Sequence, residues 1–203
     1  MEASIGIKFN DFALIASDSQ AVFSVLVVKH DCDKIYKLND HLMMSAGGEP
    51  GDAVQFAEFI AKNIQLFRMR SGFELAPKHA ATYVQRNLAD YLRSRTPYQT
   101  NLILAGYDKD TKTPELYWID YLATVCEVPY AVHGYAQIFT LGLLDKDYRP
   151  DMNEEEAVEL MKSCIKQIDK RFLGSLQNFH IKKVDANGVT VLPPISVKDF
   201  VKE

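Results

Sequence analysis

Apolar residues alternate with polar or small residues along the first 46 positions of the chain. Ile5, Ile7 and Phe9 occupy every second position, and further short apolar runs follow in FALIAS, VFSVLVV and HLMMSA. Successive side chains of a β-strand point to opposite faces of its sheet, so this alternation is typical of strands with a buried face. The N-terminal region is therefore predicted to form a series of strands.

Helical spacing replaces this alternation after residue 50. Asp52, with Gln55 three positions later, predicts a helix N-cap. Gly72 predicts the end of that helix, and Pro77 suits the first turn of a second one. The apolar residues that follow helical spacing are Ala53, Phe56, Ala57, Ile60, Ile64 and Phe67, then Ala81, Val84, Leu88 and Leu92.

The second half repeats the order of strands followed by helix. Strands are predicted in NLILAGY, LYWIDY and TVCEV, and again in FHIKKV and GVTVL with Asn187 and Gly188 at the turn between them. One or two helices lie between these groups, and the better defined one has Asn153 as its N-cap and ends near Arg171. Residues 193–203 are expected to form a C-terminal tail.

This order of elements predicts an α+β fold. Two antiparallel sheets stacked face to face, with helices outside, would bury every apolar helix stripe, although other α+β sandwiches also satisfy the order. We find no linker or repeat, and we expect residues 1–203 to form a single domain.

Composition excludes several classes of function. The 23 Lys and Arg residues are balanced by 27 Asp and Glu residues, so we expect no binding to nucleic acid. The N-terminus lacks a basic region with a long apolar stretch after it, and no run of about 18 apolar residues occurs, so neither a signal peptide nor a membrane span is expected. Three widely spaced cysteines suit reduced thiols in the cytosol or nucleus.

Two local motifs suggest ligands, and both are better explained by structure. His30, Asp31, Cys32 and Asp33 are possible metal ligands, but strand alternation would send His30 and Cys32 to one face and the two aspartates to the other. The glycines of SAGGEPGD lack the Lys-Ser/Thr of a phosphate-binding loop. We therefore expect neither a metal nor a cofactor.

Seven short segments occur along the chain in a characteristic order: IGIKF, ALIASDSQA, the lysine of DCDKIYKLN, SAGGEPGD, GYD, the IDY of LYWIDY and LLDKDYRPD. Through them the chain resembles the beta subunits of the 20S proteasome from residue 2 to about residue 190. The resemblance implies a four-layer αββα sandwich of the N-terminal nucleophile hydrolase type. It also implies a hetero-oligomer with two ring neighbours, a facing beta ring and an alpha ring, at work in protein degradation in the cytoplasm and nucleus.

Active members of this family attack peptide carbonyls with the hydroxyl of an N-terminal threonine, which self-cleavage after a glycine exposes. In this chain Glu2 matches the threonine, and no Gly-Thr pair precedes it. A carboxylate at this position supplies neither the hydroxyl nor the free amine, so the chain is predicted to be catalytically silent. The alternative is Ser4 as an atypical nucleophile, but Ala3 precedes it and its position is shifted by about 7 Å along a strand.

The positions that support catalysis in active relatives are only partly retained. Asp18, Lys34, Gly48 and Ser175 match the acidic residue, the basic residue, the oxyanion-hole glycine and a nearby serine of those relatives. Tyr135 and Phe172 stand where the family has a second serine and an aspartate. For Asp18 and Lys34 we favour a buried ion pair between neighbouring strands over residual chemistry, because such a pair is strongly destabilising to break from one side.

Overall fold

The computed structural model of the protein describes residues 2–23, 26–174 and 176–200. Ten of the described strands form two five-stranded antiparallel sheets. The first sheet has the order β10 (Tyr130–Gly134), β1 (Ala3–Lys8), β2 (Phe12–Asp18), β11 (Asn178–Asp185) and β12 (Gly188–Ser196). The second has the order β5 (Ile35–Asn39), β6 (Leu42–Gly48), β7 (Thr100–Asp108), β8 (Thr113–Ile119) and β9 (Val125–Glu127).

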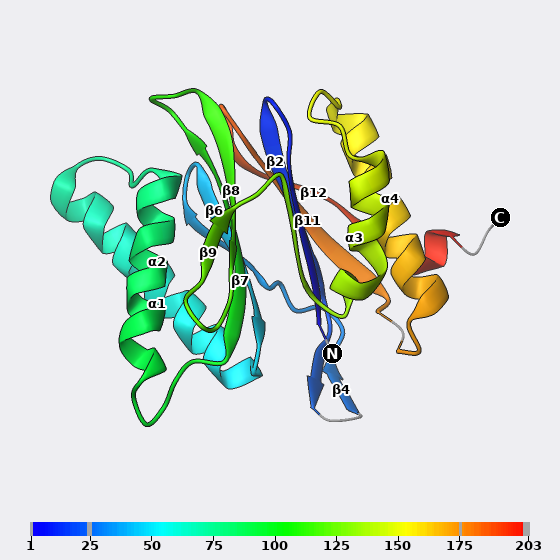
Figure 1. The fold of residues 1–203 in the computed structure, drawn as a ribbon, viewed down its shortest axis with the longest axis horizontal. Coiled ribbons are helices and arrows are strands. Elements are labelled where there is room, and N and C mark those ends of the chain that lie inside the picture. The colour runs from blue at the N-terminus through cyan, green and yellow to red at the C-terminus, as the bar shows by residue number, and fades with distance from the viewer. Residues whose placement is uncertain (1, 24–25, 175, 201–203) are drawn as a thin grey trace.

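Helices cover the outer faces of the stacked sheets, as Figure 1 shows. Helices α1 (Pro50–Ser71) and α2 (Pro77–Leu92) lie on the second sheet, and α3 (Ala136–Asp147) and α4 (Glu154–Arg171) lie on the first. The predicted four-layer αββα sandwich is confirmed. In the described part of the chain, no helix is both long enough and apolar enough to cross a bilayer.

Strand β2 lies at the centre of this arrangement, and all seven of its residues are buried. Leu14 packs into the core between the first sheet and its helices, whereas Ala13 and Ile15 pack between the two sheets. Alternate side chains of a strand point to opposite faces, so a strand covered on both faces needs apolar residues throughout. This explains the continuous apolar run in FALIAS.

The start of α1 differs from the prediction. Its N-cap is Glu49, and Pro50 occupies the first turn, so the prediction of Asp52 as the cap was wrong. The fixed backbone dihedral of proline is suited to the first helical position, and this moves the start of the helix upstream. Asp52 instead accepts a hydrogen bond from the backbone N–H of Gln99 at 3.0 Å. Gly72 ends the helix in the left-handed conformation, as predicted.

The two helices on the first sheet differ in how clearly the sequence predicts them. Helix α4 begins with the expected cap, in which Asn153 accepts from Glu156 N–H while the Glu156 side chain accepts from Asn153 N–H. The sequence does not define the bounds of helix α3, because its apolar residues do not form one stripe. Leu144 is fully buried there, whereas Ile138 is 77% exposed.

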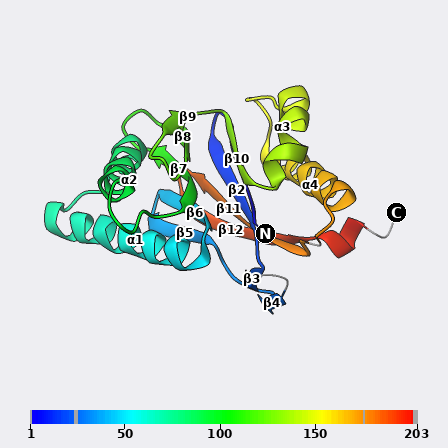
Figure 2. The same ribbon diagram turned by 60° about the horizontal axis from the view of Figure 1, so that its bottom comes forward.

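The C-terminal strands and one projecting hairpin complete the fold. The turn between β11 and β12 consists of Ala186 and Asn187, and Gly188 already belongs to β12. Strand β12 continues to Ser196 and a 3-10 helix spans Val197–Phe200, so the described part of the expected tail is ordered structure. Strands β3 (Ala21–Phe23) and β4 (Leu26–Lys29) pair as a separate hairpin that projects beside the N-terminus (Figure 2).

Candidate functional site

A cavity of about 440 Å³ opens at the end of the sandwich where the chain begins. Glu2 and Ser4 line it from the start of the first sheet, and Gly48 lines it from the end of β6. His133 and Tyr135 contribute a further wall from the end of β10. The cavity therefore lies between the two sheets and combines residues that are far apart in the sequence.

The side chain of Glu2 is bonded to the second sheet across this cavity. Its Oε2 accepts a hydrogen bond from the backbone N–H of Gly48. Burial raises the pKa of the Glu2 carboxyl, and the charge of Asp18 adds to this effect, while Lys34 and the Gly48 N–H oppose it. The residue at the expected nucleophile position is thus an anchored carboxylate.

Position 48 requires glycine because of its backbone conformation and the close approach of the neighbouring strand. Its φ is +130°, a conformation that side chains rarely adopt, and a Cβ built there would lie 2.2 Å from the carbonyl oxygen of Gln99. A larger residue would have to displace the neighbouring chain. The glycine that was predicted to match the oxyanion hole does direct its N–H into the cavity region, toward Glu2.

Asp18 and Lys34 form the buried ion pair that was predicted, with 2.8 Å between Lys34 Nζ and Asp18 Oδ2. Asp18 also accepts hydrogen bonds from the N–H groups of Ala3 at 2.9 Å and Gln20 at 3.1 Å. The pair does not join neighbouring strands, because Asp18 ends β2 in the first sheet and Lys34 immediately precedes β5 in the second. That part of the prediction was wrong, and the pair instead links the two sheets.

Ser4 is held inside the first sheet. It is the second residue of β1, is 6% exposed, and its Oγ lies 3.0 Å from Ser17 Oγ. Lys34, the basic residue that could activate a nucleophile, is committed to Asp18. The described partner of the Ser4 hydroxyl is thus another hydroxyl and not a base, which removes support for Ser4 as the nucleophile.

The two positions that depart from the family pattern meet in space. The rings of Tyr135 and Phe172 lie 4.8 Å apart at an angle of 32°, and Phe139 lies 6.2 Å from Phe172. An aromatic contact therefore occupies the place where the resemblance implies a serine and an aspartate. The sequence showed each replacement but did not predict the contact. Ser175 lies outside the described residues.

The segment with possible metal ligands binds other protein groups instead. Residues 30–33 lie between β4 and β5 rather than in a strand, so the alternation used to separate their side chains was wrong. Asp31 pairs with His180 at 2.9 Å and Asp33 pairs with Lys182 at 2.6 Å. Among the described residues, no group of three or more His, Cys, Asp or Glu side chains is arranged to hold a metal.

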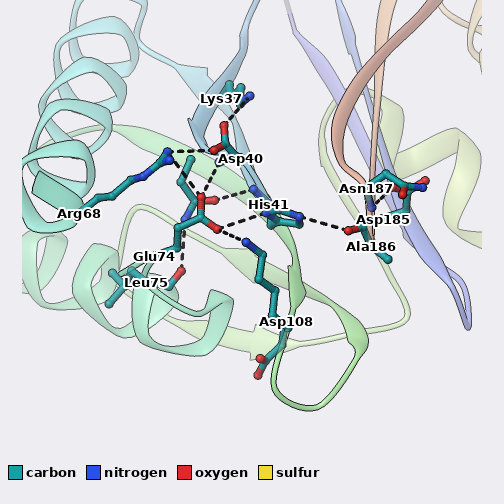
Figure 3. Close-up of polar contacts among 12 residues, drawn as sticks. Lys37, Asp40, His41, Arg68, Glu74, Leu75, Asp108, Asp185, Ala186 and Asn187 are labelled. Atoms are coloured by element: carbon teal, nitrogen blue, oxygen red, sulfur yellow. Dashed lines mark hydrogen bonds and ion pairs between the residues drawn. The ribbon is translucent and has the colours of Figure 1, made fainter. Parts of the chain in front are cut away.

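A second polar cluster, which the sequence did not predict, lies at the end of the sandwich that carries the β5–β6, β7–β8 and β11–β12 turns, and Figure 3 shows its contacts. Glu74 pairs with Lys109 at 2.8 Å, His41 at 3.2 Å and Arg68 at 3.5 Å. The other ring nitrogen of His41 lies 3.3 Å from the carbonyl oxygen of Ala186 in the β11–β12 turn. Burial raises the pKa of Glu74, but Lys109 and the other partners outweigh it and lower that pKa overall.

These contacts join helix α1 with four connecting segments, and apart from Arg68 these partners of Glu74 and His41 lie 33 or more positions away. No local motif marks such a cluster, because each member is an ordinary surface residue in its own segment. Its acidic and basic groups are paired with one another across these segments, so it helps to hold the sandwich together at this end.

The fold and the cavity define an N-terminal nucleophile hydrolase architecture in which the nucleophile position holds a carboxylate. The chain belongs to the proteasome subunit family, which matches residues 2–184. It is 43% identical to proteasome subunit beta type-4 of Saccharomyces cerevisiae over 93% of this chain and 96% of the relative. It is 47% identical to proteasome subunit beta type-2 of Oryza sativa subsp. japonica, over 93% of this chain and 88% of the relative.

A further relative, proteasome subunit beta type-2-B of Arabidopsis thaliana, is 43% identical over 93% of this chain and 94% of its own length. The chain is thus a homologue of the yeast type-4 and plant type-2 beta subunits, and it is a non-catalytic member of the threonine peptidase family. The predicted resemblance to a silent beta subunit is confirmed. Membership of this family implies assembly with other proteasome subunits.

Proposed function

We propose that this chain is a structural subunit of the 20S proteasome core at the beta-4 ring position. It completes the beta ring around the proteolytic chamber and breaks no peptide bond itself. Its partners are two neighbours in the ring, the facing beta ring and the alpha ring. The work of the assembled particle is ATP- and ubiquitin-dependent protein degradation in the cytoplasm and nucleus.

The observation that carries this proposal is the contact between Glu2 and Gly48. A working site needs a hydroxyl with a nearby base, and a free backbone N–H to stabilise the oxyanion. Here the nucleophile position holds a carboxylate, and that carboxylate occupies the Gly48 N–H. The fold is retained, but the nucleophile is replaced by Glu2 and the Gly48 N–H is hydrogen-bonded to its carboxylate.

Assembly is supported by apolar residues that the single chain leaves in water. On the β4 strand of the projecting hairpin, Leu26 is 66% exposed, Val27 42% and Val28 71%. Three consecutive exposed apolar side chains on one strand are unusual for a protein that works alone, and typical of a surface that another protein covers. We propose that this hairpin contacts a neighbouring subunit.

The proposed subunit is a single domain that works without a cofactor. We treat residues 1–203 as a single domain, because the three apolar cores share strands of the same two sheets. Asp18, Lys34, Gly48 and Ser175 are remnants of the family site in this proposal, and Asp18, Lys34 and Gly48 have the structural roles described above. No cofactor, nucleic acid or membrane takes part in the proposed function.

Incorporation into a particle tests the structural role directly. The tagged full chain is expressed in cells that supply the other subunits, and native extract is separated by size. We expect the chain in a multi-subunit particle and not near 23.0 kDa. The double variant Leu26→Asp, Val28→Asp should lower incorporation by about tenfold or more, since 1.4 kcal/mol of lost binding free energy has that effect. Lys29→Ala, on the same hairpin, is the matched control.

A mechanism-based probe for N-terminal nucleophiles tests the silent site in the same particles. We expect mass spectrometry to find the probe on other subunits and no label on this chain. Label that is present on the wild-type chain and lost in a Ser4→Ala variant would support the peptidase alternative and overturn the proposal.

A further inference from the structure

One stretch of the chain carries arginines whose charge is not balanced within the protein. Residues 79–107 include Arg86, Arg93 and Arg95, a single carboxylate and no lysine. The three arginines are exposed, and among the residues that the structure describes none of them pairs with a carboxylate. The one carboxylate of the stretch, Asp90, is exposed as well and does not pair with them. The end of α2 therefore presents free guanidinium groups to its surroundings.

Arg93 and Arg95 belong to a segment whose backbone is held in place. The segment follows α2, and Ser94 N–H donates a hydrogen bond to the carbonyl oxygen of Tyr91 at 2.9 Å. The rings of Tyr91 and Tyr98 lie 5.0 Å apart, which fixes the far side of the segment against the helix. Figure 1 shows the segment, between α2 and β7, at the same end of the molecule as the N-terminus. Because the backbone is already ordered, little conformational entropy is lost there when a partner binds.

The residue types of this surface indicate a protein partner with acidic side chains. Arginine and tyrosine are enriched among the residues that dominate the binding energy of protein interfaces, and Tyr91 is 40% exposed two positions before Arg93. A guanidinium group offers parallel N–H donors that match the two oxygens of a carboxylate. Nucleic acid fits less well, because its phosphates need a wider basic field and this chain has a formal net charge of −4.

We propose that Arg93 and Arg95 form an interaction surface for an acidic patch on another subunit of the particle. This inference rests on the proposed function, because it states the chemistry of one partner in that assembly. Each guanidinium pairs with an aspartate or glutamate side chain of the partner. Arg86, about two helical turns before Arg93, extends the surface along α2. Water is excluded when the partner covers the pairs, which strengthens them relative to pairs on a free surface.

Competition with the wild-type chain tests this surface. A tagged variant and an untagged wild-type chain are expressed together, particles are purified through a different subunit, and mass spectrometry gives the ratio of the two chains. Relative to tagged wild type, Arg93→Gln, Arg95→Gln should lower this ratio about threefold to tenfold. Arg93→Glu, Arg95→Glu should lower it by more than about tenfold, because like charges then face each other. Arg93→Lys, Arg95→Lys keeps both charges and should lose the least.

Two controls separate a lost contact from a changed net charge or a damaged fold. Lys112→Glu, Lys146→Glu changes the net charge by the same amount at other exposed positions and should be incorporated like wild type. The melting temperatures of the isolated full-length variants should stay close to that of wild type, because Arg93 and Arg95 have no partner in the described chain. Incorporation of the Gln variant at the wild-type ratio, or an equal loss in both charge reversals, would overturn the proposal.

A zero-length cross-link tests the chemistry of the partner. In particles with Arg93→Lys, Arg95→Lys, a carbodiimide should join position 93 or 95 to an aspartate or glutamate of another subunit, and mass spectrometry locates the link. Links confined to this chain would overturn the inference and leave the proposed function standing. Retention of the isolated wild-type chain on single-stranded DNA, lost in Arg93→Gln, Arg95→Gln, would assign the surface to nucleic acid and also overturn the inference. A wild-type chain that never enters the particle would overturn the inference and the proposed function together.

Discussion

The two polar clusters of this protein lie at opposite ends of the sandwich and differ in how far water reaches them. At the cavity end, the side chain of Asp18 is fully buried and that of Lys34 is 12% exposed. At the far end, Glu74 is 17% exposed, but its partners Arg68 and Lys109 are 49% and 57% exposed (Figure 3). Both clusters connect parts of the chain that are distant in sequence.

This difference changes what each cluster contributes to stability. A buried pair has lost its hydration, so removing one partner leaves an uncompensated charge, which costs about 3–5 kcal/mol. Exposed pairs are screened by water and salt, and each contributes about 0–1 kcal/mol. A single substitution in the ion pair at the cavity end should therefore cost much of the free energy of unfolding. Each substitution at the far end should cost only a small part of it.

The largest effect is expected for Asp18→Asn. The amide cannot neutralise Lys34, and we expect the free energy of unfolding to fall by about 3–5 kcal/mol. Urea unfolding of the full chain measures it. The double variant Asp18→Asn, Lys34→Met removes both charges and should recover part of the loss. A loss below about 1 kcal/mol in the single variant would mean that the pair behaves like a surface pair.

The pH dependence of stability should also come from the cavity end. Burial lowers the pKa of His133 to about 4, although the carbonyl oxygens of Leu102 and Ile119 oppose the shift. In the unfolded chain this histidine takes up its proton near pH 6.5, so stability should fall as pH drops from about 6.5 to about 4. The expected loss is about 3 kcal/mol over this range.

His133→Gln is the matched control for that measurement, because it keeps a polar side chain beside Trp118, whose ring lies 5.0 Å from that of His133, and cannot titrate. Unfolding by urea at pH 7, 6, 5 and 4 should show a smaller decline for His133→Gln than for wild type. Parallel declines in the two proteins would assign the pH dependence to other groups.

The smallest effect is expected at the far end. Glu74→Gln should lower the free energy of unfolding by about 1 kcal/mol, because the partly exposed cations Arg68 and Lys109 lose a shared charged partner. The difference from wild type should shrink in 1 M NaCl, where the screening length is about 3 Å. Lys62→Gln, which breaks the exposed pair with Glu58, is the control and should cost about 0.3–0.5 kcal/mol. If the loss of unfolding free energy in Glu74→Gln did not depend on salt, the Glu74 cluster would behave like the buried Asp18–Lys34 pair.

Most of the fold could be predicted from the sequence because its signals are local. Period-two alternation, the Asn153 cap and the Gly72 stop each act within a few residues, and the structure has the elements they predict. Asp52 was misassigned because Pro50 begins the helix two residues earlier. Helix α3 gave no usable stripe because its exposed face carries apolar residues such as Ile138.

The sequence identified individual residues of the candidate site, but it did not predict the contacts between them. Matching positions indicated that Glu2 replaces the nucleophile and that Asp18 and Lys34 are retained. The hydrogen bond from Gly48 to Glu2 and the tilted ring contact between Tyr135 and Phe172 depend on how two sheets and a helix end come together. Such contacts join residues 37 to 46 positions apart, and no periodicity or local motif encodes them.

The ion pair between the two sheets has a consequence for how a working enzyme becomes a structural part. Asp18 holds the backbone of Ala3 and the ammonium of Lys34, so the same side chain fixes the start of the chain and joins the halves of the sandwich. Exchanging the nucleophile alone ends the chemistry without disturbing these bonds. A change at the nucleophile position thus removes the reactive hydroxyl and leaves the link between the two sheets in place.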